Sequence, residues 1–186
     1  MNRREAVQYI SLLLGGTIVG GNAFLTGCIS NTGNSTTFST TDIAYLDEIA
    51  NTILPETTTP GAKAAMVGQF MTVMINDCYE AKDQKIFHDG MTKLNDLSKK
   101  TYDHPFTKIT DQQRHDLLVQ LDKEQKDYMK NKKEEDPTHY FRMMKELTML
   151  GYFTSEIGCT KARRYMETPG KFESCIDYKK GDKAFA

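Results

Sequence analysis

The sequence predicts an all-α fold, a single helical bundle-like domain of about five helices with an irregular C-terminal tail. Two observations lead to this prediction. Apolar residues recur every three or four positions in five successive segments, which is the spacing of one face of an α-helix. No segment alternates apolar and polar residues as a half-buried strand does.

The first two helices are expected before residue 80. Thr41-Asp42 can cap the first helix, and Pro55 stops it. A loop follows in which Pro60-Gly61 signals a turn, and the second helix runs from about Ala62 to Tyr79. The inward positions are expected to be Ile43, Leu46, Ile49, Ile53 and Leu54 in the first helix, and Met66, Val67, Phe70, Met74 and Cys78 in the second.

Three more helices follow. The third, from about Asp83 to Lys100, contains Gly90, which weakens a helix by about 1 kcal/mol relative to alanine and so indicates a kink or close packing. The fourth begins at Thr110-Asp111 and becomes very polar after Asp122, so its end is expected to be solvated. The fifth starts at Asp136-Pro137. Their apolar positions are Ile86, Phe87, Met91, Leu94 and Leu97, then Leu117, Leu118 and Leu121, then Tyr140, Phe141, Met144, Leu147 and Leu150. Met143 and Met149 widen the apolar surface of the fifth helix, which is therefore expected to be central or covered by a partner.

The N-terminal segment, residues 1–27, is predicted to be an export signal. Arg3 and Arg4 precede an apolar, glycine-rich stretch and stand where a twin-arginine signal has its pair, although ordinary signals also contain Arg-Arg. Leu25–Cys28 resembles a bacterial lipobox, which implies a lipid-anchored protein on the periplasmic side of the cell envelope, with Cys28 lipidated. The alternative is a plain signal cut near Gly27 that leaves Cys28 a free thiol.

Removal of that signal leaves one domain, residues 41–186, behind a Ser-, Thr-, Asn- and Gly-rich segment, 28–40, that is expected to be a flexible tether. Without Arg3, Arg4 and Glu5, the 24 Lys and Arg and the 25 Asp and Glu of the chain become 22 and 24, a net charge of −2. This balance gives no basic footprint, so no nucleic-acid partner is expected.

Motifs for catalysis are lacking in the sequence. It has no glycine-rich phosphate loop, no pair of histidines at helical spacing and no C-x-x-C, and Ser155 lies in T-S-E-I-G rather than in G-x-S-x-G. We therefore expect no catalytic residue, no metal site and no cofactor in this chain.

Two segments have the glycines, prolines and hydroxyls of tight, specified backbone geometry. The first is Thr57-Thr58-Thr59-Pro60-Gly61-Ala62-Lys63-Ala64-Ala65. The second is Gly151-Tyr152-Phe153-Thr154-Ser155-Glu156-Ile157-Gly158, followed by Tyr165 and by Pro169-Gly170-Lys171-Phe172-Glu173-Ser174-Cys175. Together these segments resemble the signature of the gluconate 2-dehydrogenase subunit 3 family, over about Ser39 to Cys175.

The resemblance implies a small helical accessory subunit rather than a catalyst. Its partner would be a large subunit of the glucose-methanol-choline (GMC) oxidoreductase type that carries FAD, oxidises a sugar or polyol, and passes electrons on, often to a c-type cytochrome. The small subunit would stabilise the large one and help to export it. The competing class is a stand-alone envelope lipoprotein that binds a ligand or acts as a scaffold. An independent enzyme is disfavoured because no catalytic constellation is found.

The second segment is the predicted partner interface, because large amphipathic rings are enriched at interface hot spots. The interface residues are expected to be Gly151, Tyr152, Phe153, Thr154, Ser155, Glu156, Gly158, Tyr165, Pro169 and Gly170. The competing view is that the rings fill the domain's own core and the glycines serve turns. Glu156 is either a structural cap or a partner contact. The tail from Met166 to Ala186 either wraps its own domain or lies on another protein.

The cysteines leave further alternatives. With Cys28 lipidated, three remain in an oxidising compartment, so one thiol is free or pairs across an interface. The family pattern often has cysteine at the position of Cys175 and a small residue at that of Cys159, and the two can form a disulfide here. Cys78 lies on an apolar helical face and is expected to be a buried free thiol.

Overall fold

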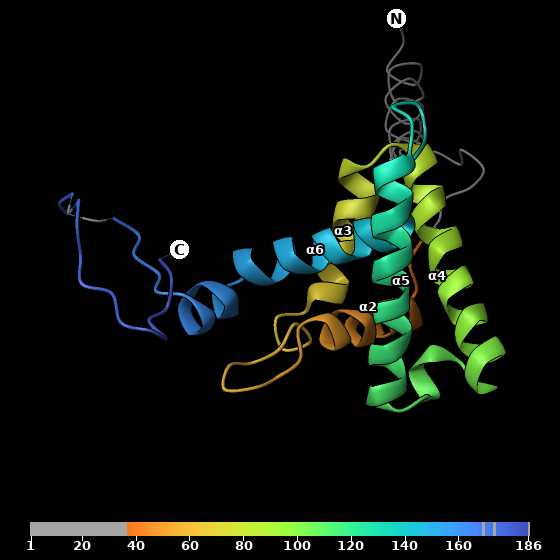
Figure 1. The fold of residues 1–186 in the computed structure, drawn as a ribbon, viewed down its shortest axis with the longest axis horizontal. Helices are drawn as coiled ribbons and strands as arrows, with labels where there is room; N and C mark the ends of the chain where they lie inside the picture. The colour runs from red at the N-terminus through yellow and green to blue at the C-terminus, as the bar shows by residue number, and fades with distance from the viewer. Residues whose placement is uncertain (1–36, 169, 173, 186) are drawn as a thin grey trace, which may run out of the picture. The chain divides into compact units, whose positions relative to one another are not determined.

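The computed structural model describes residues 37–168, 170–172 and 174–185, and it confirms the all-α prediction (Figure 1). Five α-helices and no strand are found in this part of the chain. The α-helices are α2 (Thr40–Ile53), α3 (Val67–Cys78), α4 (Ala81–Tyr102), α5 (Asp111–Asn131) and α6 (Tyr140–Thr154). A short 3₁₀-helix, η1 (Phe106–Lys108), and a short π-helix, η2 (Gly158–Ala162), complete the helical elements described.

Helices α2 and α5 each begin with a reciprocal capping box. In α5 the cap is Thr110, as predicted, and its partner is Gln113. In α2 the cap is Ser39 rather than the predicted Thr41-Asp42. The Ser39 hydroxyl accepts the Asp42 amide at 3.2 Å, and the Asp42 carboxylate accepts the Ser39 amide at 2.8 Å. Phe38, in the segment expected to be a tether, packs against Phe87 of α4 with ring centroids 6.1 Å apart.

Helix α3 starts five residues later than predicted. Residues 61–66 form turns, and Met66 adopts a left-handed conformation with φ of 52°. Met66 therefore lies outside the helical repeat and is 64% exposed, so the prediction that it faces inward is wrong. Cys78 is exposed too, because it is the last residue of α3 and follows Ile75, the final buried position of that helix.

Helix α6 also starts later than predicted, at Tyr140. Asp136 stabilises a preceding turn instead, because its carboxylate accepts the Lys133 amide at 2.8 Å. The helix is capped by His139, whose Nδ1 accepts the Phe141 amide at 3.2 Å.

The core surrounds α6, which contacts α2, α3, α4 and α5, so the prediction that this helix is central is confirmed. Met143 is buried as well as Met144, which explains why the apolar surface of α6 is wide. Leu150 is 45% exposed, however, so its predicted inward position is wrong. Gly90 of α4 permits the approach of α6, since a Cβ there would lie 2.4 Å from Cβ of Tyr140. The largest fully buried side chains are Phe87, Phe106, Phe141, Leu46, Ile49, Met71, Ile75, Leu94, Leu117, Leu121, Met144 and Leu147.

Glu48 is the carboxylate at the centre of an ion-pair cluster at the edge of this core. It lies 2.5 Å from Nζ of Lys63 and 2.5 Å from Nη1 of Arg114, which ties α2 to the loop before α3 and to α5. Partial burial works to raise the pKa of Glu48, but the two cations outweigh it and lower that pKa.

Asp122 of α5 is the centre of a second cluster. Its carboxylate lies 2.7 Å from Nζ of Lys126 and 2.5 Å from Nζ of Lys145 on α6. Partial burial works to raise the pKa of Asp122, but hydrogen bonds from the two lysines outweigh it and lower that pKa to about 2.

No helix in the described part of the chain is both long and apolar enough to cross a membrane.

Candidate partner interface

The two motifs found in the sequence meet in space. The Tyr152 hydroxyl, near the end of α6, donates a hydrogen bond to the carbonyl oxygen of Pro60 at 2.6 Å, across 92 positions of sequence. The Tyr152 ring is only 4% exposed. Because Pro60 lies in the loop between α2 and α3, this bond fixes that loop against the end of α6.

Glycines let the backbone pack closely at both sides of this junction. A Cβ at Gly61 would lie 2.6 Å from the backbone nitrogen of Glu56, and the Ala62 amide bonds the Leu54 carbonyl at 2.9 Å. A Cβ at Gly158 would lie 1.8 Å from the carbonyl oxygen of Tyr152. The glycines therefore serve packing of the domain's own backbone.

The hydroxyl pair of the motif bonds to the backbone of α6 and the turn after it. Thr154 donates to the Leu150 carbonyl at 2.7 Å. The Ser155 hydroxyl donates to the Tyr152 carbonyl at 2.7 Å and accepts the Gly158 amide at 3.0 Å. Ser155 thus ends α6 and starts the turn that leads into η2.

The predicted interface residues therefore divide between the core and the surface. Gly151, Tyr152 and Gly158 are buried, an arrangement that favours the alternative in which these residues fix the domain's own shape. Glu156 is exposed, and its carboxylate makes no hydrogen bond or ion pair with the described residues, so the structure gives it no capping role. Tyr165 is 57% exposed. The interface therefore has to be sought on the exposed part of the motif and beyond it.

The segment after η2, residues 163–185, is named the C-terminal arm below. Every residue that the structure describes from Arg164 to Phe185 is exposed. Several are large and apolar or aromatic, the kind of side chain that a partner covers. They are Tyr165, Met166, Phe172, Ile176, Tyr178 and Phe185. This exposure favours the alternative in which the tail lies on another protein over the one in which it wraps its own domain.

Two arginines organise the start of the arm. The Arg163 guanidinium stacks over the Phe153 ring at 4.5 Å, and that of Arg164 stacks over the Phe185 ring at 4.2 Å. The end of the arm returns to this point, since the Arg164 amide and Nε donate to the carbonyls of Ala184 and Lys183, each at 2.8 Å. Arg163 and Arg164 were not among the residues predicted from the sequence. The signal that could have indicated them is an Arg-Arg pair directly before an aromatic residue.

The described cysteines are all free, so the structure does not form the predicted Cys159–Cys175 disulfide. Cys159 Sγ lies 3.3 Å from the carbonyl oxygen of Phe153, which directs the thiol toward the domain, whereas Cys175 is exposed in the arm. Arg3, Arg4, Cys28 and Pro169 lie outside the described residues.

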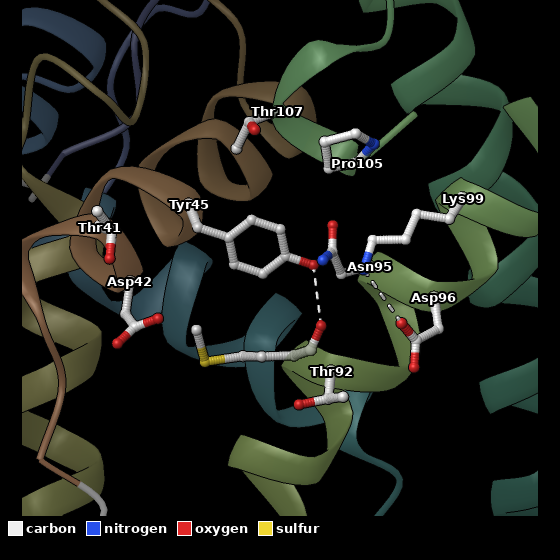
Figure 2. Close-up of a pocket in the computed structure, with 10 residues that line it drawn as sticks. Thr41, Asp42, Tyr45, Thr92, Asn95, Asp96, Lys99, Pro105 and Thr107 are labelled. Atoms are coloured by element: carbon white, nitrogen blue, oxygen red, sulfur yellow. Dashed lines mark hydrogen bonds and ion pairs between the residues drawn. The ribbon is translucent and has the colours of Figure 1, made fainter. Parts of the chain in front are cut away.

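A polar pocket of about 350 Å³ lies where α2 meets α4 and η1 (Figure 2). The Tyr45 hydroxyl donates to the Met91 carbonyl at 3.1 Å, and burial raises the pKa of Tyr45, so the ring stays neutral. Lys99 lies 3.6 Å from Asp96, and the Asn95 side chain accepts the Phe106 amide at 3.1 Å. The sequence alone does not predict this pocket, because its residues come from three elements that only tertiary packing brings together.

Among the described residues, no group of three or more His, Cys, Asp or Glu is placed to hold a metal ion.

Comparison with known proteins finds one family. The family described as gluconate 2-dehydrogenase subunit 3 matches residues 40–170, which include all five described α-helices, the first motif, and the second motif as far as Gly170. No curated protein and no solved structure matches the chain.

Proposed function

The chain belongs to the gluconate 2-dehydrogenase subunit 3 family, and from that membership we propose its role. It is the non-catalytic small subunit of an FAD-dependent, GMC-type sugar or polyol dehydrogenase complex. The observation that carries the proposal is the family match over residues 40–170, which spans the whole helical domain. The family name itself places the chain in a complex of several subunits.

The geometry of the motif supports a structural role rather than catalysis. The hydroxyls of Thr154 and Ser155 bond the backbone, and the Tyr152 hydroxyl bonds Pro60. None of these groups is left to act as a nucleophile or a base. In the proposed complex the large subunit holds FAD and the substrate, and this chain stabilises the large subunit. A c-type cytochrome is one candidate for the electron acceptor.

Affinity purification of the chain from native membranes tests this function. We expect a GMC-type dehydrogenase to co-purify and to give a flavin absorbance spectrum, and the isolated small subunit to be colourless and inactive. A small subunit that oxidises a sugar alone, with its own bound flavin, would disprove the proposal. Recovery of the chain without any flavoprotein would favour a stand-alone envelope lipoprotein.

We also propose that the chain is anchored on the periplasmic side of the envelope through Cys28. The lipobox-like Leu25–Cys28 supports this proposal. Cys28→Ala should release the protein from the membrane fraction or leave it unprocessed. Mass spectrometry of the wild-type N-terminal peptide should find thioether-linked lipid, and an unmodified cysteine there would refute the anchor.

Export is the last part of the proposal. If Arg3 and Arg4 form a twin-arginine signal, the complex is exported in the folded state. The large subunit then crosses the membrane already loaded with FAD. The double variant Arg3→Lys/Arg4→Lys should then leave both subunits in the cytoplasm, as fractionation and immunoblotting would show. Normal processing of the double variant would assign export to the route for unfolded chains.

A further inference from the structure

Basic side chains of the helical domain form ion pairs with carboxylates, whereas several of those in the C-terminal arm do not. In the domain, Glu48 and Asp122 each bind two basic side chains. From Arg163 to Phe185 the arm has six Lys and Arg but only four Asp and Glu. No ion pair joins a carboxylate that the structure describes to Arg163, Arg164 or Lys183 of the arm. The same is true of Lys161 in η2. The arm therefore presents net positive charge that its own domain does not neutralise.

The two arginines are held in place before any partner arrives. Each guanidinium lies against an aromatic ring, Phe153 for Arg163 and Phe185 for Arg164. Arg164 is fixed further, because its Nε donates to the Lys183 carbonyl at 2.8 Å. This bond uses the inner nitrogen and leaves the two terminal nitrogens for another acceptor. A planar guanidinium held in this way suits bidentate binding of a carboxylate.

These groups line a hollow of about 600 Å³ between η2 and the end of the arm. Exposed Tyr165, Met166 and Phe185 border the same hollow. Arginine and tyrosine are enriched in interface hot spots, and the core of an interface is more apolar than the rest of the protein surface. The hollow thus combines a fixed positive charge with apolar surface for a partner to cover.

We infer that this hollow is the docking site for an acidic side chain on the catalytic subunit, with the aromatic side chains of the arm covering apolar surface around that side chain. The inference rests on the proposed function, because it takes the large subunit as the occupant. The ligand chemistry is a carboxylate of an Asp or Glu in a folded protein surface. A membrane of anionic lipid fits less well, since the four acidic residues between Gly158 and Ala186 would be repelled by it.

The test compares two double variants of the full chain that remove equal charge. Arg163→Gln/Arg164→Gln changes the hollow, whereas Lys179→Gln/Lys180→Gln changes the same arm outside the lining of the hollow. Affinity is measured by calorimetry at low and at high salt, against the flavin dehydrogenase identified by the purification above. The arginine variant should bind about tenfold more weakly or worse and depend less on salt, and the lysine variant should lose about threefold or less.

A third variant, Arg163→Lys/Arg164→Lys, keeps the charge and removes the planar fork. This variant should also bind the dehydrogenase more weakly than wild type. Thermal unfolding of each free variant shows whether its helical domain remains folded. Equal losses in the arginine-to-glutamine and lysine-to-glutamine variants would overturn the inference, because net charge alone would then explain binding. The inference would also be overturned if the Arg163→Gln/Arg164→Gln variant bound the dehydrogenase as tightly as wild type does. The same holds if this variant lost binding to phosphatidylglycerol vesicles but not to the dehydrogenase. Failure of the wild-type chain to bind the dehydrogenase would instead refute the proposed function.

Discussion

Tyr152 connects the two family motifs through one hydrogen bond, to the carbonyl oxygen of Pro60. Tyr152→Phe keeps the buried ring and removes only the donor. We expect the free energy of unfolding of the isolated chain to fall by about 1 kcal/mol, because the partly buried carbonyl of Pro60 loses its hydrogen-bond donor. Urea denaturation measures the change. Tyr178→Phe, on a ring that is 75% exposed, is the control and should have no effect. An equally small effect of both variants would show that water replaces the hydroxyl.

Gly158 and Gly170 offer a matched pair in the second motif. A Cβ at Gly158 would overlap the carbonyl oxygen of Tyr152, whereas nothing lies within 4 Å of one at Gly170. Gly158→Ala should therefore destabilise the chain by about 2 kcal/mol or more, since the backbone has to shift. Gly170→Ala should be neutral or slightly stabilising because it restricts the unfolded chain. Equal melting temperatures for the two variants would contradict this account of the motif.

Periodicity in the sequence was sufficient to predict the helices themselves, but tertiary contacts decided where some of them begin. Thr110 was predicted correctly as a cap because its capping box with Gln113 is local. Asp136 has the same cap-like chemistry, yet it bonds the Lys133 amide in a turn and α6 starts later. Met66 stands in helical register with the residues after it, but its left-handed backbone removes it from the helix. Sequence alone does not distinguish these outcomes.

The candidate interface was also predictable only in part, because residue types are visible in the sequence and tertiary contacts are not. The motif around Tyr152 was found from its residue types, and its contact with Pro60 was not, because the two residues are 92 positions apart. Exposure of Tyr165 agrees with an interface role, whereas burial of Gly151 does not. Arg163 and Arg164 gain their place in the interface hypothesis only from rings that the fold brings beneath them.

The contact between α5 and α6 should depend on pH through Asp122. Its pKa of about 2 in the folded chain is below the ordinary value of 3.8. A lowered folded-state pKa adds stability that is complete above about pH 4 and is lost as the pH falls toward 2. Asp122→Asn should therefore lose less stability than wild type between pH 4 and pH 2, by about 1 kcal/mol after allowance for solvent screening.

Urea denaturation at several pH values measures this difference. Asp127→Asn, which removes an exposed carboxylate from the same helix, is the control and should follow the wild type. Parallel curves for the wild type and Asp122→Asn would show that the Lys126 and Lys145 contacts do not persist in solution.

The whole chain divides into an acidic helical domain and a basic arm. Without residues 1–27, the chain up to Ala162 has 16 Lys and Arg and 20 Asp and Glu, against six and four from Arg163 onward. Opposite charges within one chain would favour folding of the arm onto the domain, yet the described residues from Arg164 onward are exposed. The apolar side chains of the arm therefore remain uncovered in the isolated subunit. This is the arrangement expected of a segment whose apolar surface is buried only in a complex.

Truncation of the arm separates the two uses that a tail can have. A chain that ends at Arg163 keeps the stacking of Arg163 on Phe153, and every residue it loses that the structure describes is exposed. Its free energy of unfolding should lie within about 0.5 kcal/mol of the full chain, because surface groups contribute little to stability. Leu147→Ala in the truncated chain is the positive control, since loss of a buried leucine should cost about 2–5 kcal/mol. The truncated chain should nevertheless fail to bind the flavin dehydrogenase. A truncation that lowers stability by several kcal/mol would show instead that the arm wraps its own domain, and the partner surface would then have to lie on the helices.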